Sequence, residues 1–281
     1  MADDRSPRPL SRYLEFGIRI HLEDFSQTTA VVLSLYLPLA VLALSLHPPV
    51  RALMNPAGGA VSLISQMLFA QLLLRLVQVF VFVLLILRLE AHRNQEGNVW
   101  DLAEALSQLG RVARVDLAYA FGLQILAILI FWLSLTVASL LFGEGPLSLP
   151  FAFSLTAFLV IAPAVRFYFC SLAALLHGDG FAASFRRAGE VSAGGERQIV
   201  LLVLLYLLVW FAVWQIVHGF FGAGLFGQLI LQAAIMVTSI SYFFAGYRLY
   251  FDLVPAVIRR ELEARPLSRA DAEDHEDRGA G

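Results

Sequence analysis

The chain alternates between long apolar windows and short charged connections. Four windows contain no Asp, Glu or Arg: residues 28–47, 117–142, 198–221 and 225–247. Two more, 61–87 and 147–175, contain one arginine each, Arg75 and Arg166. Each is long enough for a helix to cross a hydrocarbon core of about 30 Å, which takes about 20 residues. None alternates in the pattern of a membrane β-barrel. The pattern predicts an all-α bundle of six transmembrane helices.

Three connections have a different periodicity, with apolar residues every three or four positions. The first contains Leu10, Leu14, Ile18, Leu22 and Phe25, which share one helical face. The segments near residues 98–116 and 180–195 repeat the pattern, with charged residues opposite the apolar stripe. Each precedes an odd-numbered span. We therefore expect three interfacial amphipathic helices, all on one side of the membrane.

The order of these elements predicts an internal three-fold repeat of one helix and two spans. The units cover about residues 10–90, 98–176 and 180–255, inside a single domain of residues 1–262. The last two units contain a similar four-residue motif, RFYF at 166–169 and RLYF at 248–251. We interpret its side chains as anchors near the cytoplasmic boundary, where the arginines reach lipid headgroups or Asp252: Arg166, Tyr168, Arg248, Tyr250 and Asp252. The acidic segment 263–281 is expected to be a disordered tail.

Charge distribution orients the spans. All 20 basic residues are arginines, and 16 of them fall in the N-terminal segment, the 88–116 and 176–197 connections and the C-terminal segment. The opposite side has only Arg51. Because cytoplasmic loops carry the excess of basic residues, both termini are predicted to be cytoplasmic.

No pattern in the sequence supports a catalytic or metal site. The DG-x-x-A stretch at Asp179 is similar to the start of the metal motif of membrane CDP-alcohol transferases, but the next aspartate is Asp252. Asp179 is therefore expected to be a helix cap. The only cysteine, Cys170, excludes an internal disulfide. We predict that the chain is not an enzyme and that it holds no cofactor, no metal and no nucleic acid.

Polar residues inside the spans are the main functional candidates. Intramembrane polar groups usually face the bundle interior, where they either line a pathway or join helices. Arg75 lies near the middle of its window, and none of the six windows holds an acidic residue. We therefore expect neutral partners for Arg75, with Gln71, Gln78 and a residue of the third or sixth span nearest. The complete candidate set is Gln71, Arg75, Gln78, Gln124, Gln228 and Gln232.

Three stretches carry a family resemblance: YLEFGIRIHLEDFSQTTAVVLSLYLPLAV, GFAASFRRAGEVSAGGERQIV and YFFAGYRLYFDL. They resemble the six-span membrane domain attached to some bacterial glycerophosphodiester phosphodiesterases, and the related stand-alone YciC-like inner-membrane proteins. Arg248 and Asp252 stand where that family has its closing arginine and aspartate. The resemblance covers about residues 10–262 and implies a fold in the bacterial inner membrane. The phosphodiesterase domain is absent from this sequence, so its activity is not carried over.

Two functional hypotheses follow. The first is a non-enzymatic scaffold or accessory protein that engages membrane lipids, another membrane protein or a second copy of itself. The alternative is a transporter for a small molecule or lipid, with a route lined by the Gln/Arg set. Transporters often contain discontinuous helices, which are not evident in this sequence. A hydrated cavity reaching the midplane would favour transport, whereas a closed core beside a large exposed apolar groove would favour the first hypothesis.

The predicted topology can be tested with reporters. Cytoplasmic- and periplasmic-active reporters fused after residues 58, 95, 145 and 281 should report outside, inside, outside and inside, because the arginine bias sets orientation. A reporter that places residue 281 in the periplasm would refute this topology.

Overall fold

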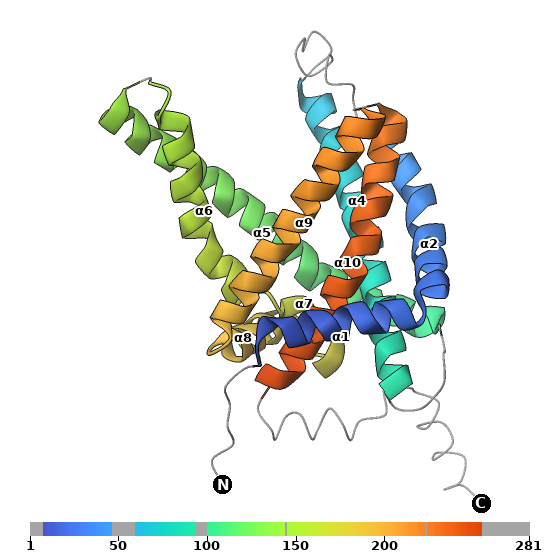
Figure 1. Cartoon of the computed structure of the whole chain (residues 1–281). Coiled ribbons are helices and arrows are strands. Elements are labelled where there is room, and N and C mark those ends of the chain that lie inside the picture. The colour runs from blue at the N-terminus through green and yellow to red at the C-terminus, as the bar shows by residue number, and fades with distance from the viewer. Residues whose placement is uncertain (1–7, 47–59, 94–99, 144, 223, 255–281) are drawn as a thin grey trace, which may run out of the picture.

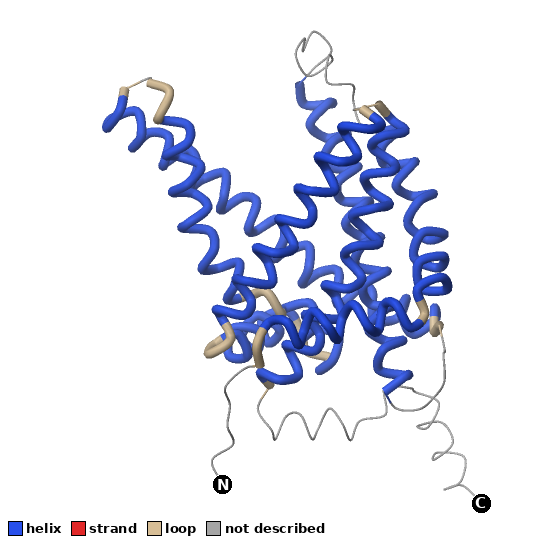
Figure 2. Tube along the Cα trace, viewed as in Figure 1, coloured by secondary structure: helices blue, strands red, loops and turns tan. Residues whose placement is uncertain are grey.

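The computed structural model describes residues 8–46, 60–93, 100–143, 145–222 and 224–254, and these form helices without a strand (Figure 2). In chain order the helices are α1 (Leu10–Glu23), α2 (Phe25–Leu46), α4 (Ala60–Arg93), α5 (Leu102–Phe142), α6 (Ser148–Arg166), α7 (Cys170–His177), α8 (Phe181–Ser192), α9 (Glu196–Phe221) and α10 (Leu225–Leu253). Six segments are long and apolar enough to span a membrane: Phe25–Ser45, Leu68–Arg93, Leu102–Phe142, Ser148–His177, Glu196–Phe221 and Leu225–Leu253. The predicted all-α architecture with six long apolar helices is confirmed.

The long helices form two groups (Figure 1). α2, α4, α9 and α10 run side by side, and α10 packs on each of the other three. α5 and α6 pack on each other and lean away from this group. Helices α1, α7 and α8 lie across one end of the bundle. α10 ends at this same end, where an ion pair joins Arg8 to Asp252.

Helix α1 packs on α10 through a face of small and polar residues. Tyr13, Gly17 and His21 are buried, one turn apart. His21 Nδ1 lies 2.9 Å from the Ser241 hydroxyl, and burial lowers the pKa of this imidazole, which favours its neutral form. The apolar stripe predicted for this segment is not the face that packs on α10. Two of its residues, Ile18 and Leu22, are exposed. That exposure is what an interfacial helix resting on lipid requires.

The second predicted amphipathic helix is not a separate element. It continues into the third span as the 41-residue helix α5, which begins after the N-cap Asp101, whose side chain accepts a hydrogen bond from the Glu104 backbone N–H. Nothing in the local sequence ends a helix at the expected junction near residue 116, because the segment has no proline and is rich in Leu and Ala. A separate second interfacial helix was therefore the wrong prediction.

The fourth predicted span is interrupted. α6 ends at Arg166, and the buried helix α7 begins at Cys170 after a tight turn in which the Tyr168 and Cys170 N–H groups bond three residues back. Three aromatic residues occupy the turn, and Phe169 is completely buried against Tyr250. Pro163, one turn earlier, also removes a helical N–H donor. This interruption was not evident in the sequence.

The predicted repeat stays a prediction. Consecutive long helices do pack in pairs, α2 with α4, α5 with α6, and α9 with α10. α1 precedes the first pair and α8 precedes the third. Before the second pair there is no separate helix, and the amphipathic first part of α5 takes that place. The predicted tail, residues 263–281, lies outside the described residues.

Close packing of α1 on α10 predicts an effect of Gly17. A Cβ built there would overlap the Ser241 carbonyl oxygen and lie 3.0 Å from the Ala245 nitrogen. Gly17→Ala should lower the free energy of unfolding by about 1–3 kcal/mol, because two backbones must separate. The matched control is Gly110→Ala, where a Cβ meets nothing within 4 Å. It should be neutral or stabilise by up to about 1 kcal/mol. Unfolding of the purified protein in detergent measures both, and equal effects would contradict this account.

Candidate functional site: a polar cluster around Arg75

Arg75 on α4 forms an ion pair with Asp116 on α5. Its Nε donates to Asp116 Oδ2 at 2.6 Å and its Nη2 donates to Oδ1 at 3.0 Å. This is the bidentate geometry that binds a carboxylate most strongly. The expectation of neutral partners for Arg75 was therefore wrong. Asp116 lies one residue before the charge-free window 117–142, and the continuity of α5 brings it to Arg75.

Asp116 is held from a third helix by α7. The Ser171 hydroxyl donates to Asp116 Oδ1 at 2.9 Å. Ser171 lies in the first turn of α7, where unpaired backbone N–H groups concentrate partial positive charge. The break between α6 and α7 therefore places a hydroxyl donor and a helix N-terminus beside the carboxylate. Both stabilise its charged form.

The two partners differ in exposure. The Asp116 side chain is 11% exposed, whereas the Arg75 side chain is 38% exposed. Nη1 of Arg75 makes a long hydrogen bond of 3.4 Å to Gln78 Oε1. A guanidinium has five N–H donors, so Arg75 retains N–H groups on Nη1 and Nη2 that bond to no described residue. The Nε–Nη2 edge of the guanidinium is therefore fully used by Asp116, whereas its Nη1–Nη2 end is only partly hydrogen-bonded.

The glutamines are only partly brought together. Gln78 lies beside Arg75, as predicted. Gln232 on α10 accepts a hydrogen bond of 2.8 Å from the Tyr36 hydroxyl on α2, which joins these two helices. Gln71 and Gln124 are exposed and Gln228 is partly buried, and none of the three bonds to another described residue. A continuous glutamine-lined route is therefore not found among the described residues.

Tyrosines complete the cluster, and the sequence analysis did not single them out for this site. The Tyr119 hydroxyl donates to the Ala164 carbonyl at 2.8 Å, and Tyr206 lies 3.0 Å from the Ser239 hydroxyl. Tyr119 is close enough to Arg75, Asp116 and Tyr168 for electrostatic interaction. The hydroxyl of Tyr168, at the α6–α7 break, bonds to no described residue. Tyrosines occur singly along the sequence, so only the fold shows that they converge.

The predicted interface anchors have different environments. Arg248 pairs with Asp252 at 3.5 Å, as expected, and Asp252 also pairs with Arg8. Arg166 is exposed at the end of α6. Tyr250, in contrast, is completely buried and its hydroxyl lies 2.7 Å from His177 Nε2. An interface role for Tyr250 was the wrong prediction, because α7 folds over that side of α10.

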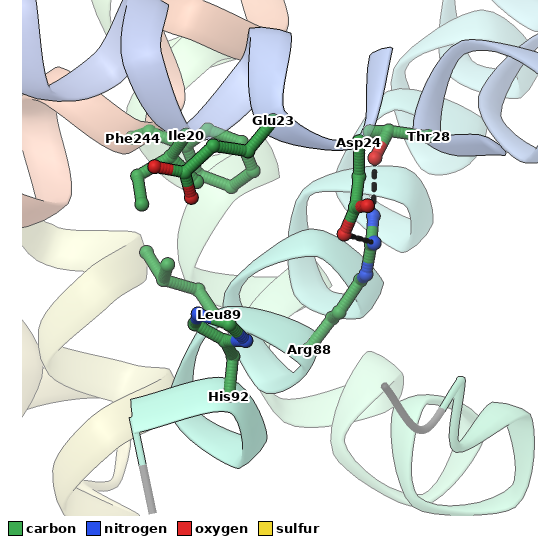
Figure 3. A pocket seen from close by; sticks show the side chains of 8 residues that line it. All are labelled: Ile20, Glu23, Asp24, Thr28, Arg88, Leu89, His92 and Phe244. Atoms are coloured by element: carbon green, nitrogen blue, oxygen red, sulfur yellow. Dashed lines mark hydrogen bonds and ion pairs between the residues drawn. The ribbon is translucent and has the colours of Figure 1, made fainter. Parts of the chain in front are cut away.

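A second charged cluster lies where α1 meets α2. Arg88 of α4 is buried and donates to Asp24 and to the Thr28 hydroxyl, and it also lies over the Trp100 ring. Figure 3 shows the pocket beside these bonds, where Glu23 and His92 lie across from Arg88. Its free volume is about 30 Å³, which is about one water molecule's share of liquid volume. The pocket has no room for an organic ligand.

Two further ion pairs join neighbouring parts of the chain. Glu90 on α4 is 1% exposed, accepts a hydrogen bond from the Tyr247 hydroxyl of α10 and pairs with Arg93. Asp179 pairs with Arg187, which raises the pKa of that guanidinium, and it does not cap α8, whose N-cap is Gly180. The expected cap role of Asp179 was wrong. We interpret both pairs as structural, because each closes on a neighbouring helix or turn.

Comparisons with known proteins do not identify the chain. No protein-family model, no curated protein and no solved structure matches it. Among the described residues, no three His, Cys, Asp or Glu side chains lie close enough to hold a metal ion. The cluster around Arg75 is therefore the candidate site, on its geometry alone.

The ion pair can be tested by removing its negative charge. Asp116→Asn should lower the free energy of unfolding by about 1–3 kcal/mol, below the value for a fully buried pair because Arg75 is partly exposed. The double variant Arg75→Leu/Asp116→Leu should recover most of that loss, because no lone charge remains. Asp101→Asn is the matched control, since asparagine caps a helix as well as aspartate. Chemical unfolding in detergent measures the set. Equal stability of the two single variants would show that the pair contributes nothing.

Proposed function

We propose that this chain is a non-enzymatic accessory protein of the bacterial inner membrane that engages membrane lipid along the side of its bundle, with both termini in the cytoplasm. The observation that carries this proposal is a partly exposed and only partly hydrogen-bonded guanidinium among membrane-spanning helices. A charged group among such helices is costly unless something solvates it. A lipid supplies both a polar head and apolar chains.

The apolar surface of the outer helices supports this proposal. Large side chains on α5, α6 and α9 are exposed, including Trp132, Leu140, Phe158 and Leu208. The shared core, in contrast, is closed: Leu84, Leu85 and Ile86 of α4 are almost completely buried, and so are Ile240 and Leu249 of α10. A closed core beside exposed apolar helices favours engagement of lipid over passage through the bundle. A membrane-protein partner or a second copy of the chain would use the same surface.

One observation favours transport as a second candidate. The break between α6 and α7 lies beside the Arg75–Asp116 pair, through Ser171. Substrate sites in many transporters are built from interrupted helices whose ends face the ligand. On this hypothesis the ion pair would bind a substrate during a conformational change of α5 and α6.

Lipid retention tests the proposal. After purification in a mild detergent and prolonged washing, native mass spectrometry should find a fixed, small number of lipids on each chain, because specific sites release lipid more slowly than the surrounding shell. A protein that washes free of lipid would refute the proposal. Uptake of lipid or solute by vesicles that contain the reconstituted protein would instead support the transport hypothesis.

A further inference from the structure

We propose that the end of the Arg75 guanidinium, formed by Nη1 and Nη2, binds the phosphate group of a membrane phospholipid. This inference rests on the proposed engagement of lipid and names the chemistry of the site. Its starting point is the unequal use of the two edges of one side chain.

The donors of Arg75 point to an acceptor with two oxygens. Asp116 occupies the edge formed by Nε and Nη2. The end of the guanidinium, formed by Nη1 and Nη2, keeps N–H groups with no described acceptor except the distant Gln78. The spacing of these nitrogens matches two oxygens of a phosphate or carboxylate. One guanidinium can then hold an internal carboxylate and an external phosphate together.

Electrostatics permits a second anion at this place. Asp116 is not neutralised by Arg75 alone, because the Ser171 hydroxyl and the first turn of α7 also stabilise its charge. Part of the positive charge of Arg75 therefore remains for another anion. A phosphodiester carries one negative charge, which matches this remainder better than a dianion does.

α5 and α9 also expose an apolar surface. The exposed apolar side chains of α5 and α9, such as Leu129 and Leu204, are suited to contact acyl chains. Phosphate chemistry and apolar surface together favour a phospholipid over a free anion.

The test compares two lipids on delipidated protein in detergent. Phosphatidylglycerol and diacylglycerol with the same acyl chains are titrated by native mass spectrometry, with inorganic phosphate as a third ligand. The wild-type protein should bind phosphatidylglycerol about tenfold more tightly than diacylglycerol, as expected for one charge-assisted bidentate contact. Inorganic phosphate alone should not bind measurably.

Two variants locate the phosphate. Arg75→Lys keeps a positive charge beside Asp116 but removes the planar guanidinium, which can bind two oxygens at once. It should therefore remove most of the preference for phosphatidylglycerol. Tyr168→Phe should leave this preference unchanged, because the Tyr168 hydroxyl lies against Gly246 of α10. The controls Arg186→Lys, on the exposed side of α8, and Tyr13→Phe, on α1, should keep the wild-type preference.

The outcomes separate this inference from the proposed function. Equal binding of the two lipids, or an unchanged preference in a folded Arg75→Lys variant, would overturn the phosphate site while lipid engagement stands. Binding of inorganic phosphate without any preference between the lipids would assign the site to a free anion and also overturn it. Loss of all lipid from the wild-type protein would refute both proposals.

Discussion

The charge of Arg75 within an apolar helix sets the arrangement of the surrounding helices. An arginine within a membrane helix is unfavourable, by up to about 2.5–3.5 kcal/mol at the helix centre on insertion scales. The fold offsets this cost with a carboxylate from α5, which in turn is held by a hydroxyl from α7. Each of these contacts requires an unusual backbone feature. α5 must stay helical through residue 116, and the helix after α6 must restart at Cys170.

Features that extend over many residues of the sequence could be predicted, whereas contacts of single residues mostly could not. Windows without charge extend over a whole span, so all six long helices could be predicted, and the four-residue spacing of Arg248 and Asp252 correctly indicated an ion pair. The partner of Arg75 could not be found in this way. A search for charge-free windows assigns Asp116 to a connection by definition, whereas amphipathic and apolar segments share one helical period and can form a single helix.

The same limit explains the other missed contacts. Arg88 and Glu90 lie near the end of α4, where charged residues suggest a solvated boundary, yet both are buried by α1, α2 or α10. Such burial depends on helices that are distant in sequence. Glutamines were chosen as candidates because they are uncommon in apolar windows. The hydroxyls of Tyr36 and Tyr206 also form hydrogen bonds between helices. Tyrosine is not recognised as polar when it stands among other aromatic residues.

The close contact between α1 and α10 also imposes an order on assembly. The surface on which Gly17 and His21 rest belongs to α10, which the ribosome makes about two hundred residues after α1. During synthesis α1 therefore has no protein surface to pack on, and its exposed apolar stripe leaves the membrane surface as its natural resting place. Only when α10 has inserted can α1 exchange that temporary support for its final one. α1 is thus made long before α10 but takes its final position only after α10, and its docking completes this part of the bundle.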